Sequence, residues 1–352
     1  MNQEAKTSRD SFIDLARGIC ALSIVFIHTV FWSGSGYVPT YVASLSLLID
    51  VPAFFFLSGM ACAGANKVTV ISVIFRLSTA FGLLALVYDV IFFEFHFKDV
   101  FLALTLSPPQ LKHLPVVTAS YWFVPVYVVA TLVGLVILNK IKRIYIPLLP
   151  VLFSYYLYFF FMGIEPPAWP ILGVNVNFLI FYLFMYLFGH FAKERIVCGQ
   201  FKQYFAVALL FIGGGFLFMA YGKIGLSALD LQSSKFPVGL PYVSASLLSI
   251  SAIIYYYSDS PLRSKWLEHV GRNAVFYYVG QGIGASILLH IVDKSSFDFW
   301  QTKLLFMFTL NLIITVAVSE GLRCVYKFAG ISCKNMFSHE NLTVSSNSGS
   351  SS

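Results

Sequence analysis

Long apolar stretches alternate with short polar connections along almost the whole chain. Crossing the hydrocarbon core of a bilayer takes about 20 mainly apolar residues in a helix. By this measure the chain contains ten candidate spans, at residues 12–32, 42–65, 71–95, 121–138, 144–163, 171–191, 203–221, 239–258, 273–292 and 302–322. The pattern therefore predicts an all-α membrane protein, a bundle of about ten transmembrane helices forming one domain over residues 1–330.

The composition supports a membrane protein. The chain of 352 residues is 58% hydrophobic and 11% charged, whereas a soluble domain carries about 25% charged residues. In such a chain a net charge of +7 does not indicate a nucleic-acid partner, and we expect membrane lipids as the surroundings instead. Residues 331–352, which end in NLTVSSNSGSSS, are rich in serine and predict a disordered cytoplasmic tail.

The lysines and arginines predict the orientation of the bundle. Positive residues collect on the cytoplasmic side of membrane proteins during insertion. With the ten spans above, 17 of the 23 lie on the side of the two termini and six lie on the other, namely Lys98, Lys112, Lys223, Lys235, Lys294 and Lys303. We therefore expect both termini in the cytoplasm.

The first span, FIDLARGICALSIVFIH, carries ionisable residues on one face. Arg17 and His28 are eleven positions apart, which places them about 20° apart around a helix and about 16 Å apart along it. Asp14 lies three residues before Arg17 and can contact it. Small side chains share this face and predict a narrow passage free of large groups, at Gly18, Ala21 and Val25.

Two interpretations of this face are open. Ionisable residues inside a membrane are costly and by default mark a functional site. The structural alternative is that Asp14 and Arg17 form an interfacial anchor pair and that His28 hydrogen-bonds a neighbouring helix. The alignment of all three residues on one face favours function.

Four blocks of the chain follow in order: RGICALSIVFIH (17–28), VPAFFFLSGM (51–60), YWFVPVYVV (121–129) and GRNAVFYYVGQ (271–281). Together they resemble the acyltransferase-3 family of membrane proteins. The first block has the spacing of that family's R-x10-H motif, and the second resembles its second helix. YWFVPVYVV (121–129) resembles its WF block, and GRNAVFYYVGQ (271–281) its late block. In the late block Ala274 and Gln281 stand where the family commonly has Ser and His, so a role for that His is not carried over.

The resemblance implies an integral membrane O-acyltransferase. Such an enzyme moves an acyl group, here expected to be acetyl, from cytoplasmic acyl-CoA to a sugar hydroxyl outside the membrane. The acceptor would be a cell-surface polysaccharide such as O-antigen, capsule or exopolysaccharide, or a lipid-linked oligosaccharide. The resemblance also implies a multi-pass protein of the bacterial inner membrane with acetyl-CoA as co-substrate. A partner protein and a homo-oligomer are left open.

Within this interpretation each candidate has a chemical role. His28 is the candidate general base, because imidazole has an ordinary pKa near 6.5; an acyl-His intermediate is the alternative. Asp50 either supports His28 or binds acceptor hydroxyls, and the structural alternative is an interfacial acid. Arg17 would hold the donor phosphates through its guanidinium, with Asp14 orienting it. Arg76, where the family places basic residues, is the second candidate phosphate ligand.

Three residues are candidates for binding the acceptor. Tyr121 and Trp122 suit stacking on a sugar ring, and they equally suit the aromatic belt of a membrane interface. Glu165 lies in the proline-rich connection GIEPPAWP. Ser58 and Gly59 are expected to permit a close helix approach. We expect no metal, because the sequence has no His–Glu pair at metal-ligand spacing.

Two other functions compete with glycan O-acylation. A transporter or flippase for a lipid-linked sugar would also need many spans and intramembrane charges, and paired halves with broken helices would favour it. A membrane acyltransferase of the MBOAT kind relies on a late His with an upstream Asn or Asp, whereas the motif here is near the N-terminus.

Overall fold

The computed structural model describes residues 10–34, 36–63, 65, 67–93, 97–105, 107–141, 144–167, 169–171, 174–197, 199–257, 262–292 and 297–328. The tail predicted to be disordered, residues 331–352, lies outside this part of the chain.

The described chain is almost entirely helical. Its elements are α1 (Ser11–Trp32), α2 (Thr40–Ser46), α3 (Val51–Cys62), α4 (Lys67–Phe92), α5 (Phe97–Leu104), α6 (Pro115–Ser120), α7 (Phe123–Lys140), α8 (Tyr145–Met162), β1 (Pro170–Ile171), β2 (Val174–Asn175), α9 (Val176–Arg195), α10 (Lys202–Ile224), the 3₁₀ helix η1 (Gly225–Leu229), α11 (Leu240–Tyr256), α12 (Lys265–Arg272), α13 (Ala274–Val292) and α14 (Trp300–Phe328). The two short strands pair antiparallel.

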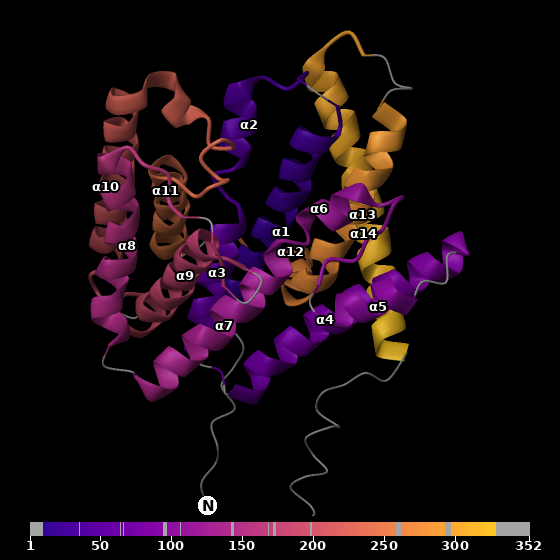
Figure 1. The fold of residues 1–352 in the computed structure, drawn as a ribbon, viewed down its shortest axis with the longest axis horizontal. Coiled ribbons are helices and arrows are strands. Elements are labelled where there is room, and N and C mark those ends of the chain that lie inside the picture. Colours follow the sequence, from indigo (N-terminus) through magenta and orange to yellow (C-terminus); the bar gives the residue numbers. More distant parts are fainter. Residues whose placement is uncertain are drawn as a thin grey trace, which may run out of the picture.

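The predicted membrane bundle is confirmed. Within the described ranges, nine helical segments are long and apolar enough to cross a membrane, and α11 is a shorter apolar helix. Together they correspond to the ten predicted spans. In Figure 1, α8, α10 and α11 lie on one side of the bundle, α13 and α14 lie on the other, and α1 and α3 lie between them.

Two of the membrane-crossing segments are broken. Thr40–Cys62, which corresponds to the second predicted span, divides into α2 and α3 at Leu47–Asp50. Pro115–Lys140 divides into α6 and α7 at Tyr121–Trp122, so the fourth predicted span, 121–138, begins at the break. Each break falls just before a helix that has proline in its first turn, Pro52 in α3 and Pro125 in α7. Proline has no N–H for the carbonyl four residues back and clashes with it, which favours a new helix over a continuous one.

Side chains from other helices bond carbonyls at both breaks. The Ser23 hydroxyl on α1 donates to the Ile49 carbonyl at 2.6 Å. The Tyr278 hydroxyl on α13 donates to the Ser120 carbonyl at 2.6 Å. Non-helical backbone at membrane depth is tolerated only where such bonds or a water-filled space satisfy it. The breaks are therefore stable features of the bundle interior.

Glycines set the closest helix crossings. A Cβ on Gly59 of α3 would lie 1.9 Å from the Tyr186 carbonyl oxygen of α9. On α1, a Cβ at Gly18 would lie 2.1 Å from the Leu267 carbonyl oxygen of α12. Backbones can approach this closely only where side chains are absent. The close helix approach predicted at Gly59 is confirmed.

Candidate functional site

Helices α1 and α3 carry polar groups at both ends of their contact. Near the N-terminal end of α1, the Arg17 Nη2 atom donates to the Ser58 hydroxyl of α3 at 3.4 Å. Towards the other end of α1, His28 is within electrostatic range of Asp50, the residue that precedes α3. Arg17 and His28 are eleven positions apart on α1, which corresponds to about 16 Å along the helix. The two helices therefore hold two polar sites at different depths.

Asp50 is the centre of the site near His28. It is 3% exposed and accepts hydrogen bonds at one oxygen, Oδ2, from the Lys235 ammonium and from the Tyr242 hydroxyl, each at 2.6 Å. Lys235 is itself only 7% exposed. A buried charge is stable only when it is paired and hydrogen-bonded. Asp50 is the N-cap residue of α3, but its carboxylate forms no capping hydrogen bond with that helix.

His28 has an unused ring nitrogen in this site. Its Nδ1 atom is buried and forms no hydrogen bond with another residue of the described ranges. Besides Asp50, Lys235 is within electrostatic range of the imidazole. Behind it, the Asn311 amide of α14 donates to the Thr29 hydroxyl at 3.0 Å and to the Val25 carbonyl at 3.2 Å. This network anchors the turn of α1 that carries His28.

Trp122 brings an aromatic surface to the same site. It lies at the break between α6 and α7 and is half-buried. The Lys235 ammonium lies 5.8 Å from its ring centre, within the range of a cation–π contact. The rings of Phe178 and Phe236 lie 5.4 and 5.3 Å from the Trp122 ring, and Phe236 meets it edge-on. Both broken spans thus contribute a residue next to Lys235.

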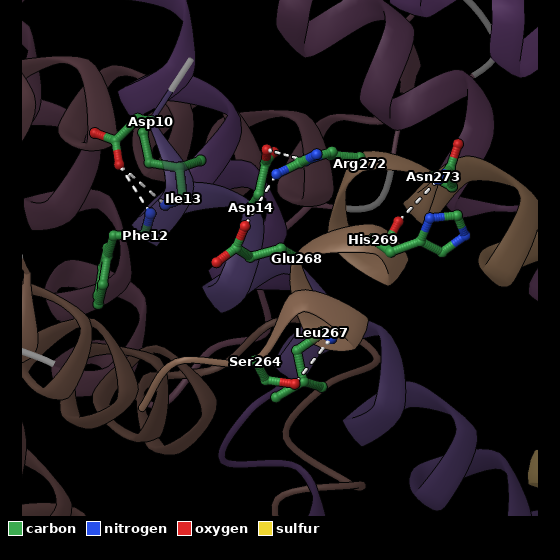
Figure 2. A network of polar contacts seen from close by, with 10 residues as sticks. All are labelled: Asp10, Phe12, Ile13, Asp14, Ser264, Leu267, Glu268, His269, Arg272 and Asn273. Atoms are coloured by element: carbon green, nitrogen blue, oxygen red, sulfur yellow. Dashed lines mark hydrogen bonds and ion pairs between the residues drawn. The ribbon is translucent and has the colours of Figure 1, made fainter. Parts of the chain in front are cut away.

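The N-terminal end of α1 has a second polar network (Figure 2). Asp14 is 2% exposed and pairs with Arg272 of α12 at 3.1 Å. Arg272 also pairs with Glu268, one turn earlier on α12, at 2.9 Å. The sequence predicted Arg17 as the partner that Asp14 orients; the structure adds Arg272, 258 residues later in the chain, as an ion-pair partner.

Asp10 caps α1 at this end. Its Oδ1 accepts hydrogen bonds from the backbone N–H groups of Phe12 and Ile13 at 3.1 and 3.3 Å (Figure 2). Its Oδ2 pairs with Lys193 at 2.6 Å and accepts a hydrogen bond from Tyr257. Burial raises the pKa of Asp10, but the hydrogen bonds from Lys193 and Tyr257 and the charge of Lys193 outweigh it, so the pKa lies below its ordinary value.

Comparison with protein-family models identifies the family of the chain. The model of the acyltransferase-3 family, described as an acyltransferase domain, matches residues 10–320, a range that includes α1, both broken spans and Lys235. The chain belongs to the acyltransferase-3 family. No curated protein and no solved structure matches this membrane acyltransferase.

The acyltransferase brings some predicted site residues together and separates others. Asp50 and Trp122 both contact Lys235, His28 is within electrostatic range of the Asp50–Lys235 pair, and Arg17 lies towards the other end of α1. Tyr121, in contrast, is 0% exposed, and its hydroxyl donates to the Ala103 carbonyl at 3.1 Å. Its ring therefore offers no face to a sugar in this structure.

The two remaining candidates, Arg76 and Glu165, form no described contact with either polar site. Arg76 is half-buried on α4 and forms no ion pair with another described residue. Glu165 is exposed in the connection after α8. No contact in the described ranges links either side chain to Arg17 or His28.

The narrow face predicted on α1 does not form an open passage. Gly18 lies against the backbone of α12, Ala21 packs with Val270 and Tyr277, and Val25 is fully buried. The small side chains permit helix packing at these positions instead of lining a channel. The physical reason is that an amphipathic segment more than 240 residues later covers this face.

Sequence reasoning gave three residues of interest no role in the site. Lys235 was counted among the positive residues of an outer connection, and Tyr242 carried no motif. Gln281, which replaces the family's late His, is 1% exposed, and neither amide atom bonds another described residue. The departure at Gln281 is visible in the sequence, whereas Lys235 and Tyr242 are joined to Asp50 by the fold alone.

Proposed function

We propose that this acyltransferase moves an acyl group, acetyl in the first instance, from cytoplasmic acyl-CoA to a sugar hydroxyl of a cell-surface polysaccharide. O-antigen, capsule and exopolysaccharide are the acceptors considered, and the bacterial inner membrane is the location. The observation that carries this proposal is the placement of Arg17 and His28 at different depths of α1, with Arg17 bonded to Ser58 of α3 and His28 within electrostatic range of Asp50, which precedes α3.

The shape of the acyl-CoA donor matches the separation of Arg17 and His28 along α1. Acyl-CoA carries phosphates at one end and a thioester at the end of a long, thin arm. Arg17 is permanently charged, and its planar guanidinium can donate two parallel hydrogen bonds to a phosphate. With the N-terminal end of α1 in the cytoplasm, Arg17 would bind the phosphates there, and Arg76 on α4 would be a second ligand. The thioester could then reach the depth of His28.

His28 would act as the general base on the opposite side. As the acceptor hydroxyl attacks the thioester carbonyl, the imidazole takes the hydroxyl proton. The carbon–sulfur bond then breaks, and the CoA thiolate takes the proton back from the imidazolium. The Asp50 carboxylate would stabilise the imidazolium between these steps, as the acid of a hydrolase triad does. Trp122 would stack on the acceptor sugar.

An acyl-histidine route uses the same residues. In it, the imidazole attacks the thioester and the CoA thiol leaves, after which the acceptor hydroxyl takes the acyl group from His28. Both routes release one CoA thiol for each acyl group transferred. Both also require His28 as the reacting group.

The deciding experiment compares cells that express wild type, His28→Ala and, as a control, His290→Ala. His290 lies exposed near the end of α13. At matched abundance in the membrane, we expect O-acetylation of surface glycan to be lost with His28→Ala and kept with His290→Ala. Retained acetylation with His28→Ala would exclude His28 from the mechanism.

Transport of a lipid-linked sugar is the second candidate function, because the two broken spans are a feature of transporters. Purified protein with acetyl-CoA separates the two functions. An acyltransferase releases free CoA thiol, which a thiol reagent detects, and His28→Ala abolishes the release. A transporter leaves the thioester intact in both samples.

A further inference from the structure

The connection between η1 and α11 folds back into the bundle at two points. Lys235 pairs with Asp50 across 185 residues of sequence. Three residues later, the Val238 N–H donates to the Asn177 side-chain oxygen at 2.8 Å, and the Asn177 amide donates to the Val238 carbonyl at 3.3 Å. The connection is thus fixed to the start of α9 while Lys235 extends to the start of α3.

The environment of Lys235 is unusual for a lysine in a connection between spans. Its ammonium lies 5.4, 5.8 and 5.9 Å from the ring centres of Phe236, Trp122 and Tyr242. Its ion-pair partner in the described chain is Asp50. Taking two charges out of water costs free energy that a simple apolar contact would avoid. This cost suggests that the pair has a purpose other than stability.

The geometry of the pair indicates that purpose. Lys235 and Tyr242 both bond the same Asp50 oxygen, Oδ2. No hydrogen bond joins the other oxygen, Oδ1, to a residue that the structure describes. The Asp50 carboxylate is within electrostatic range of His28, whose Nδ1 is also unbonded to any described residue. Two donors on one oxygen fix the plane of the carboxylate and leave the second oxygen for another group.

We propose that Lys235 and Tyr242 are positioning residues for acyl transfer, which hold the Asp50 carboxylate oriented with Oδ1 directed to the acceptor hydroxyl or to His28. This inference rests on the proposed function. Neither residue exchanges a proton or an acyl group; both act through Asp50. The acceptor hydroxyl would donate to Oδ1 and so be oriented for proton transfer to His28.

Tyr242→Phe is the mildest test, because it removes one donor from Oδ2 without leaving a buried charge unpaired. Tyr156→Phe is the matched control: Tyr156 is also fully buried, and its hydroxyl donates at 2.8 Å to a backbone carbonyl, that of Asn177. A hydrogen bond to a charged group contributes enough that its loss changes a rate about tenfold or more. We therefore expect Tyr242→Phe to lower kcat by about tenfold, and Tyr156→Phe to leave kcat unchanged.

Release of CoA thiol from acetyl-CoA, with acceptor glycan present, measures kcat and the KM for acetyl-CoA. Thermal unfolding in detergent measures stability in parallel. The two tyrosine variants should show similar losses of Tm and wild-type KM values for acetyl-CoA. A purely structural role for Tyr242 would lower Tm in the same way but would leave kcat at the wild-type value.

Repeating Tyr242→Phe in a protein that already carries Asp50→Asn tests whether Tyr242 affects kcat through Asp50. Residues that act as one unit are strongly non-additive, so Tyr242→Phe should not lower kcat further in Asp50→Asn. Lys235→Met leaves Asp50 charged and buried, so its test uses the double variant Lys235→Met/Asp50→Asn, which removes both charges. We expect the double variant to unfold at a temperature near that of the wild type and to match the kcat of Asp50→Asn.

Each outcome either supports or overturns this inference. A wild-type kcat for Tyr242→Phe, or the same tenfold loss in the Asp50→Asn background, would overturn positioning through Asp50. In that case thiol release by the wild type, lost in His28→Ala, would still support the proposed function. Absence of thiol release by the wild type would overturn the proposed function and the positioning roles together.

Discussion

Gly59 of α3 and Gly189 of α9 face each other where the two helices cross. A Cβ on Gly59 would lie 1.9 Å from the Tyr186 carbonyl oxygen, and a Cβ on Gly189 would lie 1.9 Å from the Phe56 carbonyl oxygen. Both obstacles are backbone atoms of a helix, which cannot move aside as a side chain can. The position of Asp50, at the start of α3, therefore depends on this crossing.

We expect Gly189→Ala to prevent normal accumulation of the protein in the membrane. Overpacking in a rigid core costs about 1–3 kcal/mol or more, and here a backbone must separate from a backbone. Gly214→Ala in α10 is the matched control, because a Cβ there meets nothing within 4 Å. Membrane abundance and Tm in detergent measure the effect. Equal values for the two variants would show that α3 and α9 are less closely packed than the structure indicates.

The fold was predictable to the extent that it depends on local pattern. The lengths of the apolar stretches predicted the spans, and the spacing of Arg17 and His28 predicted a shared side of α1. The breaks follow from Pro52 and Pro125. Both prolines lie inside apolar stretches long enough to cross a membrane, so the length of these stretches did not predict the breaks. Helix boundaries were also shifted: α9 begins at Val176, after a short strand pair, and not at residue 171.

The candidate site was only partly predictable, because its ion pairs join distant segments. Asp14 was expected to orient its neighbour Arg17, yet Arg272 on α12 also pairs with it. Asp50 was chosen for its charge, but nothing near it in the sequence indicates Lys235 or Tyr242. Such pairs depend on how helices pack across the whole chain, which periodicity does not reveal.

Arg17 should determine the affinity for the donor. Loss of a charge-assisted hydrogen bond to phosphate should raise the KM for acetyl-CoA by about tenfold or more in Arg17→Gln. If Arg76 is a second ligand, Arg76→Gln raises the same KM. Lys140→Gln, at the exposed end of α7, is the control and should not change it. A lower Tm with an unchanged KM in Arg17→Gln would identify Arg17 as a structural partner of Ser58.

Trp122 and its neighbour Tyr121 should behave differently. Trp122→Leu removes the ring beside Lys235 and should raise the KM for acceptor glycan by about fivefold, the size of one aromatic contact. Tyr121→Phe removes the hydrogen bond to Ala103 and should lower stability by about 1 kcal/mol without changing the acceptor KM. Kinetics with graded acceptor concentrations test both. An acceptor KM that rises in Tyr121→Phe and not in Trp122→Leu would reverse this assignment.

Gln281→Leu should separate stability from activity. A buried amide that lacks hydrogen bonds lowers stability by about 1–3 kcal/mol, so an apolar side chain of similar size should raise Tm. If the amide binds a substrate group, the same change lowers kcat/KM for acyl transfer. A Tm that falls would mean that the amide has a stabilising partner in the folded protein.

Asp10 should make stability depend on pH in the acid range. Because its pKa is lowered by folding, its contribution is complete above the ordinary aspartate value of about 4 and is lost as pH falls through the lowered value. The side chains of Lys193 and Asp10 are 23% and 27% exposed, so the contribution of their ion pair to stability is discounted to about 1 kcal/mol.

Asp10→Asn keeps the helix cap and should lower Tm at pH 7 by about 2 °C. The gap should narrow below about pH 4 and close as pH falls through the lowered pKa of Asp10, because protonated Asp10 resembles Asn. Asp298→Asn, an exposed position, should show no gap at either pH. A gap for Asp10→Asn that persists or widens in acid would contradict a lowered pKa.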